Sequence, residues 1–337
     1  MKRRAFLAQA GAAAAVAALP YTASAFGPTK PDGAKSRVVV LRDEDEALTP
    51  DAPAPNRVRE LLDEAARMLA GDARPADAWA RWFKPDDRVG IKVNCLGFAT
   101  SPVLALALAE AIGSAGVAPE RIILWDRSDR ELRSAGHTLR TSGKGVRCFG
   151  TDALASRGGE GYVSEIATSG AIGSLYSRIV TEETTALASA AVLKDHNLAG
   201  LTGCLKNFYG AIHNPNKYHA NGCDPFIADV CAHPHIRGRL RLAFCDATRP
   251  QYDGGPPSRP DWQWAYGGIL LATDPVALDR VALEILERKR AAAKMKSLAD
   301  ANRPVRYLAS AEARGLGKAD LARIEVIGIG KPWLDVG

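Results

Sequence analysis

The feature that most constrains the fold is a series of short apolar runs that alternate with segments of helical periodicity. The run 188–193 is almost continuously apolar, which is typical of a strand covered on both faces. Comparable strand-like runs recur at 38–41, 88–94, 121–126, 146–149, 240–245, 268–273 and 324–329. Between them, apolar residues recur every three to four positions, as in the helix predicted to begin at Asn56 and to end before Gly71. This order predicts an α/β fold with a mainly parallel sheet and helices on both faces.

Length and composition agree with such a fold and leave its division open. The chain has 337 residues, of which 47% are hydrophobic and 24% charged, so collagen-like, coiled-coil and wholly disordered chains are excluded. Residues 37–337 are predicted to form one α/β domain, with two lobes at 37–187 and 188–337 as an alternative. The net charge is +6 and no basic stripe interleaved with aromatic residues occurs, so no nucleic-acid partner is expected.

Residues 1–25 have the pattern of a twin-arginine signal peptide. Lys2-Arg3-Arg4 precedes a short Ala-rich apolar stretch, and Ala23-Ser24-Ala25 resembles a cleavage site. The alternative is an N-terminal helix of the folded domain. Residues 26–36 are predicted to form a linker. We therefore expect export in the folded state by the twin-arginine translocase, most simply to a bacterial periplasm. No later segment is apolar enough to span a bilayer, so no transmembrane segment is expected in the mature chain.

Export in the folded state is consistent with a cofactor that is inserted before export, and a divalent transition metal is one candidate. The chain has six cysteines but no C-x-x-C, so neither a ferredoxin-type iron–sulfur cluster nor a zinc ribbon is expected. In an oxidising compartment a pair such as Cys223 and Cys231 could form a disulfide. The sequence leaves the pairing of the six cysteines open.

Polar residues follow several predicted strands at the point where each strand ends. They are Asn94, Asp126, the run 194–196, Asp246 and Asp274. The carboxyl ends of parallel strands meet at one edge of an open sheet, where ligands bind, so these side chains are expected to converge there. The alternative is helix or turn capping by the three aspartates. Capping is favoured for Asp274, because a proline follows it at the first helical position.

The segment 194–235 holds five of the six histidines. Imidazole binds several transition metals, and His196 lies just beyond a buried strand, so it is a candidate metal ligand or acid–base residue. A structural histidine with satisfied hydrogen bonds is the alternative. His233 and His235 flank a proline and indicate an exposed turn. No H-E-x-x-H spacing strengthens the metal hypothesis.

A glycine-rich stretch runs from Gly200 to Gly210. Glycines beside a lysine can form a nest of backbone amides that binds an anion, with Lys206 as a point charge and Asn207 as a further donor and acceptor. The residue order is not that of a Walker loop, and no G-x-S-x-G element supports a hydrolase triad. A carboxylate or a phosphate group is therefore the expected ligand of this stretch.

The same residues resemble the DUF362 family, a domain of unknown function. The stretches 193–196 and 200–210 resemble its K-x-H and L-K-N-x-x-G elements, and the stretches 244–246, 274–279 and 311–317 resemble its later elements. The resemblance extends over nearly the whole mature chain and implies an α/β fold. It marks shared polar positions at Lys194, His196, Lys206, Asn207, Asp246, Asp274 and Asp279.

Two qualifications apply to what the resemblance implies. Many relatives add ferredoxin-type cysteine motifs, and this chain has none, so their iron–sulfur clusters are not implied here. Asp279 lies one turn into a predicted helix, so it also suits the role of complementing that helix's N-terminus. The family name carries no reaction.

Two functions of different classes are consistent with these residues. The first is an exported, metal-assisted enzyme that acts on a small anionic substrate, a carboxylate or a phosphate. Its residues would be His196, Lys194 and Asp246 in catalysis, Lys206, Asn207 and Gly210 in substrate binding, and His196 and Asp246 as metal ligands. The second is a non-catalytic periplasmic accessory protein that binds a metal or an anion. An electron-transfer partner that uses the cysteines is disfavoured by the missing C-x-x-C.

Overall fold

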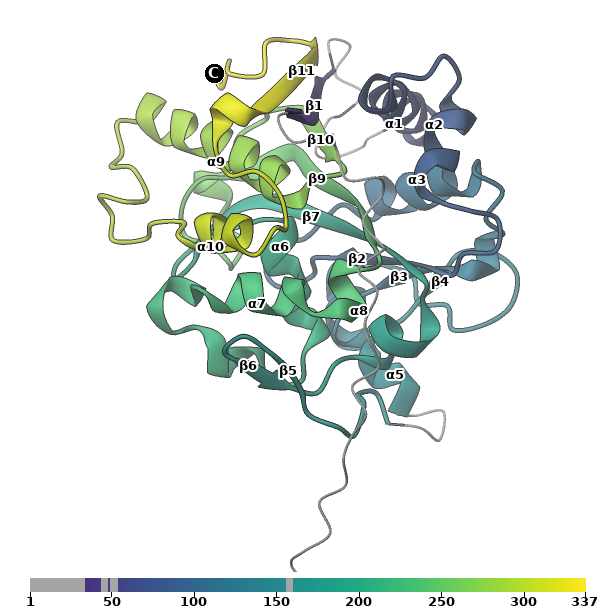
Figure 1. Ribbon diagram of the computed structural model, residues 1–337. Helices are drawn as coiled ribbons and strands as arrows, with labels where there is room; N and C mark the ends of the chain where they lie inside the picture. Colours follow the sequence, from purple (N-terminus) through teal and green to yellow (C-terminus); the bar gives the residue numbers. More distant parts are fainter. Residues whose placement is uncertain (1–33, 44–47, 49–53, 156–159) are drawn as a thin grey trace, which may run out of the picture.

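The computed structural model describes residues 34–43, 48, 54–155 and 160–337 (Figure 1). The predicted signal peptide and nearly all of the predicted linker lie outside these residues. The centre of the described part is a nine-stranded sheet. Its spatial order is β11 (Ile324–Gly330), β1 (Ser36–Arg42), β10 (Gly268–Ala272), β9 (Leu240–Gln251), β7 (Ala186–His196), β2 (Val89–Val93), β3 (Ile122–Trp125) and β4 (Arg147–Cys148), with β8 (Gly200–Thr202) paired to β7.

The sheet is mainly parallel, as the sequence predicts. Strands β9, β7, β2, β3 and β4 run in one direction, and β1 and β11 are parallel to each other. The exceptions are β10, which is antiparallel to both of its neighbours, and β8, which forms a hairpin with β7. All eleven residues of β7 are buried, which agrees with its almost continuous apolar sequence.

Helices cover both faces of the sheet, as predicted (Figure 1). Alternate residues of a strand point to opposite faces, and β1 shows the consequence. Val39 and Leu41 pack in one core with α1 (Pro55–Ala70) and its neighbours, whereas Val38 and Val40 pack on the other face with α9 (Pro275–Ala292). The other helices on the first face are α2 (Pro75–Trp82), α3 (Pro102–Gly113) and α4 (Asp129–Ser134), which contributes Leu132 to this core.

Short elements on the second face surround the candidate site. The helix α6 (Cys204–Asn207) lies directly after β8 and contacts α9 and α7 (Phe226–Ala232). The other short helices and strands on this face are α5 (Thr151–Ala155), β5 (Ala167–Ser169), β6 (Ile172–Ser174), α8 (Pro234–Arg237) and α10 (Tyr307–Ala313). Single turns of other helix types are η1 (Pro119–Arg121), η2 (Ile179–Glu183), η3 (Phe208–Ala211), η4 (Pro215–Tyr218), η5 (Ala220–Cys223), η6 (Pro260–Trp262) and η7 (Leu321–Arg323).

Strands from both halves of the chain share the sheet. Strand β2 belongs to segment 37–187, and its neighbour β7 belongs to segment 188–337 except for its first two residues. Strand β1 lies between β10 and β11, which both belong to the later segment. The two segments are therefore joined by continuous strand pairing in the described residues.

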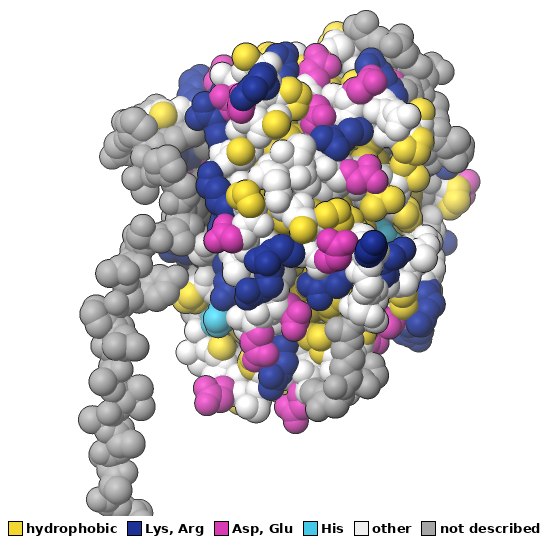
Figure 2. Space-filling view, turned by 90° about the vertical axis from the view of Figure 1, so that its right-hand side faces the viewer, with side chains coloured by type: hydrophobic (Ala, Val, Ile, Leu, Met, Phe, Trp, Pro, Cys, Tyr) yellow, Lys and Arg dark blue, Asp and Glu magenta, His cyan; other side chains and the backbone are white. Residues whose placement is uncertain are grey.

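Across the described residues, no helix combines the length and the apolar character that crossing a membrane requires. Basic and acidic side chains are interspersed on the face shown in Figure 2, with apolar side chains between them.

Candidate functional site

Three neighbouring parallel strands bring their polar ends together at one edge of the sheet. Asn94 follows β2, Asp126 follows β3, and Lys194 and His196 lie in the last residues of β7. The helix α6, which carries Lys206 and Asn207, lies against the same edge. Because β2, β3 and β7 are parallel neighbours, the strand-end argument from the sequence places these residues correctly.

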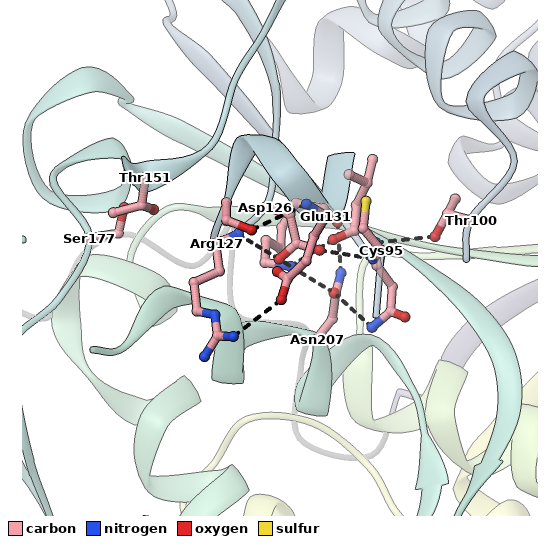
Figure 3. Close-up of polar contacts among 12 residues, drawn as sticks. Cys95, Thr100, Asp126, Arg127, Glu131, Thr151, Ser177 and Asn207 are labelled. Carbon is pink, nitrogen blue, oxygen red and sulfur yellow. Dashed lines mark hydrogen bonds and ion pairs between the residues drawn. The ribbon is translucent and has the colours of Figure 1, made fainter. Parts of the chain in front are cut away.

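Lys92 is the centre of the first cluster at this edge, although the sequence analysis did not single it out. It lies in β2 and is 1% exposed. Its Nζ donates to Oδ1 of Asp126 at 2.6 Å, to the carbonyl of Val93 at 2.6 Å and to Oδ1 of Asn207 at 3.2 Å. An ammonium group has three N–H donors, so all of them are occupied. The second oxygen of Asp126 accepts a hydrogen bond from the amide of Cys95 at 2.8 Å, and Figure 3 shows Asp126 and Asn207 within this network.

Asn207 and Gly210, both predicted to bind substrate, are fitted to this cluster. Nδ2 of Asn207 donates to the carbonyl of Lys92 at 2.7 Å and to Oγ of Ser189 at 3.1 Å, so its two N–H groups are occupied. A Cβ on Gly210 would lie 2.6 Å from Cε of Lys92 and 2.9 Å from Oδ1 of Asp126. Glycine is therefore required here by close packing against the buried ion pair.

Lys194, predicted as a catalytic residue, holds the loop that follows β2. Its Nζ donates to Oδ1 of Asn94 at 2.9 Å, to the carbonyl of Leu96 at 2.6 Å and to the carbonyl of Phe98 at 2.5 Å. Burial and the positive charge of Lys206 lower the pKa of Lys194 to about 7. Three oxygen acceptors nevertheless favour the ammonium form, and they leave it no N–H for a ligand.

Asp246 lies inside β9, because that strand continues to Gln251 beyond the predicted end. The pairing with β7 becomes irregular directly after Asp246, between Val192 and Lys194. Its carboxylate accepts hydrogen bonds from the amide of Ser101 at 2.9 Å and from the amide and hydroxyl of Thr248 at 3.0 and 2.7 Å. Burial raises the pKa of Asp246. Its contacts fix the start of α3.

The predicted anion nest is occupied by a carboxylate of the chain itself. Asp279, in the first turns of α9, accepts hydrogen bonds from the amides of Cys204 at 2.6 Å and Leu205 at 3.1 Å. It therefore caps the N-terminus of α6 and not that of its own helix. A Cβ on Gly203 would lie 2.4 Å from this carboxyl group, which explains the glycine. Burial raises the pKa of Asp279 to about 7.

Asp274 lies at the opposite edge of the sheet, because β10 runs antiparallel to its neighbours. This corrects the expectation that all the strand-end aspartates converge. Its carboxylate accepts hydrogen bonds from the amide of Ala277 at 2.9 Å, from Oγ of Ser36 at 2.6 Å and from the amide of Lys318 at 3.0 Å. Asp274 is thus the N-cap of α9, the role favoured by the proline that follows it.

Lys206 differs from the other two buried lysines. It is 8% exposed, yet its Nζ has no hydrogen-bond or ion-pair partner among the described residues. The ammonium lies 4.5 Å from the centre of the Tyr209 ring, a cation–π contact. Burial lowers the pKa of Lys206 to about 8. Its positive charge lowers the pKa values of His196 and His219, and it partly offsets the rise that burial causes in the pKa of Cys223.

His196 and His219 form a ring pair next to Lys206. Their centroids are 5.9 Å apart at an interplanar angle of 25°. Nδ1 of His196 accepts from the amides of Leu198 and Ala199 at 3.1 and 3.2 Å, so the ring hydrogen is assigned to Nε2. Nδ1 of His219 lies 3.0 Å from the carbonyl of Pro215, which only accepts, so here the hydrogen is assigned to Nδ1.

These hydrogen-bond patterns give the Nε2 atoms of the two imidazoles opposite roles, one as a donor and one as an acceptor. His196 presents an N–H donor, and His219 presents the lone pair of Nε2. Burial, reinforced by the charge of Lys206, lowers the pKa of His196 to about 2 and also lowers that of His219. Both rings are therefore neutral at physiological pH.

The predicted metal ligands His196 and Asp246 share no contact in the described structure, and Nδ1 of His196 is occupied by backbone amides. Across the described residues, no three His, Cys, Asp or Glu side chains gather in a way that could hold a metal ion. His196 and Asp246 therefore do not meet in the described residues, and the metal stays a prediction. Cys223 and Cys231, the pair considered for a disulfide, are free buried thiols.

Sequence reasoning missed Lys92, Tyr209 and His219. Lys92 lies in a strand with alternating polarity, which is normally the pattern of a solvent-facing side chain. His219 lies in the histidine-rich segment but has no spacing that sets it apart. Tyr209 directly follows Phe208 in the glycine-rich stretch, and its apolar neighbours made it resemble a core residue.

The comparisons with known proteins agree with the resemblance found in the sequence. A family model described as "Domain of unknown function (DUF362)" matches residues 89–284, which is more than half of the chain. This range begins at β2 and ends in α9. It includes the residues described at the carboxyl edge of the sheet, which are Lys92, Asn94, Asp126, Lys194, His196, Lys206, Asn207 and His219. No curated protein matches the chain. The chain therefore belongs to the DUF362 family.

Proposed function

We propose that the chain binds a small anionic compound, a carboxylate or a phosphate, at Lys206 and acts on it by acid–base chemistry. One observation carries the proposal: Lys206 is a buried lysine whose ammonium has no acceptor among the described residues. A buried charge without a partner is unfavourable, so an anionic ligand gains a strong interaction there. Lys92 and Lys194, by contrast, have all three N–H groups occupied.

The neighbouring imidazoles supply the acid–base part of this proposal. The Nε2–H group of His196 can donate a hydrogen bond to a ligand oxygen, and Nε2 of His219 can accept a proton. A protein that only holds an anion has no use for a proton acceptor beside the cation. For this reason the enzyme is favoured over the accessory binding protein. Asp279 and Asn207 then act as positioning residues, because Asp279 accepts hydrogen bonds from the first amides of α6 and Asn207 joins α6 to β2 and β7. Asp246 instead fixes the start of α3.

The test is ligand binding by the full chain, with inorganic phosphate and acetate as probes in calorimetry. Lys206→Gln is expected to weaken binding roughly tenfold or more, since one charge-assisted contact is lost. Lys217→Gln removes the same charge from an exposed lysine and is the matched control. Binding is expected to weaken as the pH rises through about 8, because Lys206 loses its proton there. Equal affinities of the two variants and the wild type would refute the site.

We also propose that the chain is exported by the twin-arginine route to the periplasm, which rests on the pattern of residues 1–25. Replacing Arg3 and Arg4 with lysine is expected to leave the precursor in the cytoplasm of a bacterial host. Fractionation and immunoblotting would measure this. Continued export of the double variant would contradict the proposal.

A further inference from the structure

The three buried lysines of the described chain have different chemistry. Lys92 and Lys194 each donate three hydrogen bonds to oxygen, so their nitrogen atoms carry protons and have no free lone pair. Among the described residues Lys206 has no oxygen acceptor, and its ammonium lies over the ring of Tyr209. No hydrogen bond from these residues therefore fixes Lys206 in its ammonium form.

The surroundings of Lys206 favour loss of a proton near neutral pH. Among the described residues no carboxylate contacts its Nζ, and its positive charge lowers the pKa of the neighbouring Lys194. Burial lowers its pKa to about 8, so a large fraction of the side chain is a neutral amine in slightly alkaline solution. A desolvated neutral lysine is a nucleophile for carbonyl carbon.

The stacked imidazoles beside Lys206 meet the other needs of such a reaction. Attack on a carbonyl requires a hydrogen-bond donor for the oxygen that becomes negative, and His196 presents Nε2–H. It also requires a group that moves a proton from nitrogen to oxygen, and His219 presents a free Nε2. The tautomers of the two rings are fixed by different backbone groups, so the two roles are not interchangeable.

We propose that Lys206 forms an imine with a small oxo acid, a carboxylate that also carries an aldehyde or ketone group. This inference rests on the proposed anion site and names its substrate class. The carboxylate end is attracted by the positive charge of Lys194, which also lowers the pKa of the neighbouring His196, whereas Arg303 is already paired with Asp195 and Asp253.

The step balances without an oxidant or a reductant. The amine lone pair of Lys206 forms a C–N bond to the carbonyl carbon, and the C=O π electrons move to oxygen, which His196 stabilises by a hydrogen bond. His219 takes a proton from the nitrogen and delivers it to the oxygen, which gives a carbinolamine. The C–O bond then breaks, a second proton moves from nitrogen to the departing oxygen through His219, and water leaves as the C=N bond forms.

The experiment is reductive trapping of the full chain with glyoxylate or pyruvate and borohydride, followed by peptide mass mapping. One stable adduct on Lys206 is expected. Lys206→Arg keeps a positive charge but lacks a nucleophilic amine, so it is expected to lose the adduct, whereas Lys217→Arg is expected to keep it. An adduct distributed over exposed lysines, with none at Lys206 in the wild-type chain, would overturn the inference whether or not the variants fold.

Phosphate competition separates this inference from the proposed function, and two kinetic measurements test it further. Excess phosphate is expected to slow trapping at least severalfold. If phosphate binds but no adduct forms, the imine alone is overturned. If the adduct forms at a rate that phosphate does not change, the shared anion site is overturned. His219→Gln is expected to lower the trapping rate roughly a hundredfold or more, on the scale of general acid–base catalysis. In the wild type the rate is expected to rise with pH to about 8, with Tyr209, His196, His219, Cys223 and Lys194 as the titratable groups around Lys206.

Discussion

Lys206 and Asn207 are consecutive residues of α6, yet their surroundings are opposite. Asn207 faces a cluster in which the donors of Lys92 and of Asn207 itself are all occupied within the chain. Lys206 contacts the ring of Tyr209 and has no acceptor among the described residues. A fully satisfied buried network stabilises and orients the fold, whereas an unsatisfied buried cation is costly to the fold and useful to a ligand. The difference separates the support of the site from the site itself.

The largest expected effect comes from breaking the satisfied cluster. Lys92→Met leaves Asp126 as a buried carboxylate without its cation, and it is expected to lower the free energy of unfolding by about 3–5 kcal/mol. Urea unfolding of the full chain measures this, with Lys217→Met as the exposed control. A loss below about 1 kcal/mol would show that the cluster is not the stabilising half of the comparison.

Lys206→Met is expected to act in the opposite direction. The pKa of Lys206 is about 8 in the folded chain and ordinarily 10.5, so between these values the unfolded state binds more protons. Stability of the wild type therefore rises with pH across this window, by at most about 3 kcal/mol. The variant is expected to lack this component and to exceed the wild type in stability at pH 7. Urea unfolding at pH 7 and pH 10 compares the two, and parallel curves would contradict the assignment.

Gly210→Ala tests how closely α6 and the buried ion pair approach each other. The added Cβ would lie 2.6 Å from Cε of Lys92, so the side chain of Lys92 must shift. A loss of about 2 kcal/mol is expected in thermal or urea unfolding. Gly143→Ala, at a glycine with free space around it but a positive φ, provides a comparison for backbone strain alone. Gly210 has no positive φ, so a loss near zero there would mean that the close approach contributes nothing.

Thr248→Val has the smallest expected effect. It removes the hydroxyl that donates to Asp246 at 2.7 Å and keeps the amide hydrogen bond to the same oxygen. A loss of about 1 kcal/mol in unfolding free energy is expected, with phosphate affinity unchanged within error. A weaker affinity for phosphate would show that Asp246 takes part in ligand binding and does not only support the fold.

The sequence predicted the fold and one edge of the sheet well, for a physical reason. Apolar runs show which segments are buried and in what order strands and helices follow each other. Because the strands that carry them are parallel neighbours, Asn94, Asp126 and Lys194 lie at the same edge of the sheet. Apolar periodicity, however, does not indicate whether neighbouring strands are parallel or antiparallel. The antiparallel β10 therefore carries Asp274 to the other edge.

Contacts between distant segments were also beyond the sequence. The glycine-rich stretch has the amides of an anion nest, but the occupant is Asp279, which is supplied by a helix far along the chain. Likewise, nothing local distinguishes Lys194, whose ammonium is surrounded by oxygen atoms, from Lys206, whose ammonium is not. The sequence could indicate that these lysines are important, but it could not show which of them has all its N–H groups occupied within the chain.

The position of β1 has a consequence for the order in which the chain folds. Among the described strands β1 is the first to be synthesised, but both of its partners, β10 and β11, lie more than 200 residues later. Until the ribosome has made β11, the apolar residues 38–41 have no complete place in this sheet. Closure of the sheet around β1 therefore waits for β11, and until then β1 must be kept from pairing elsewhere.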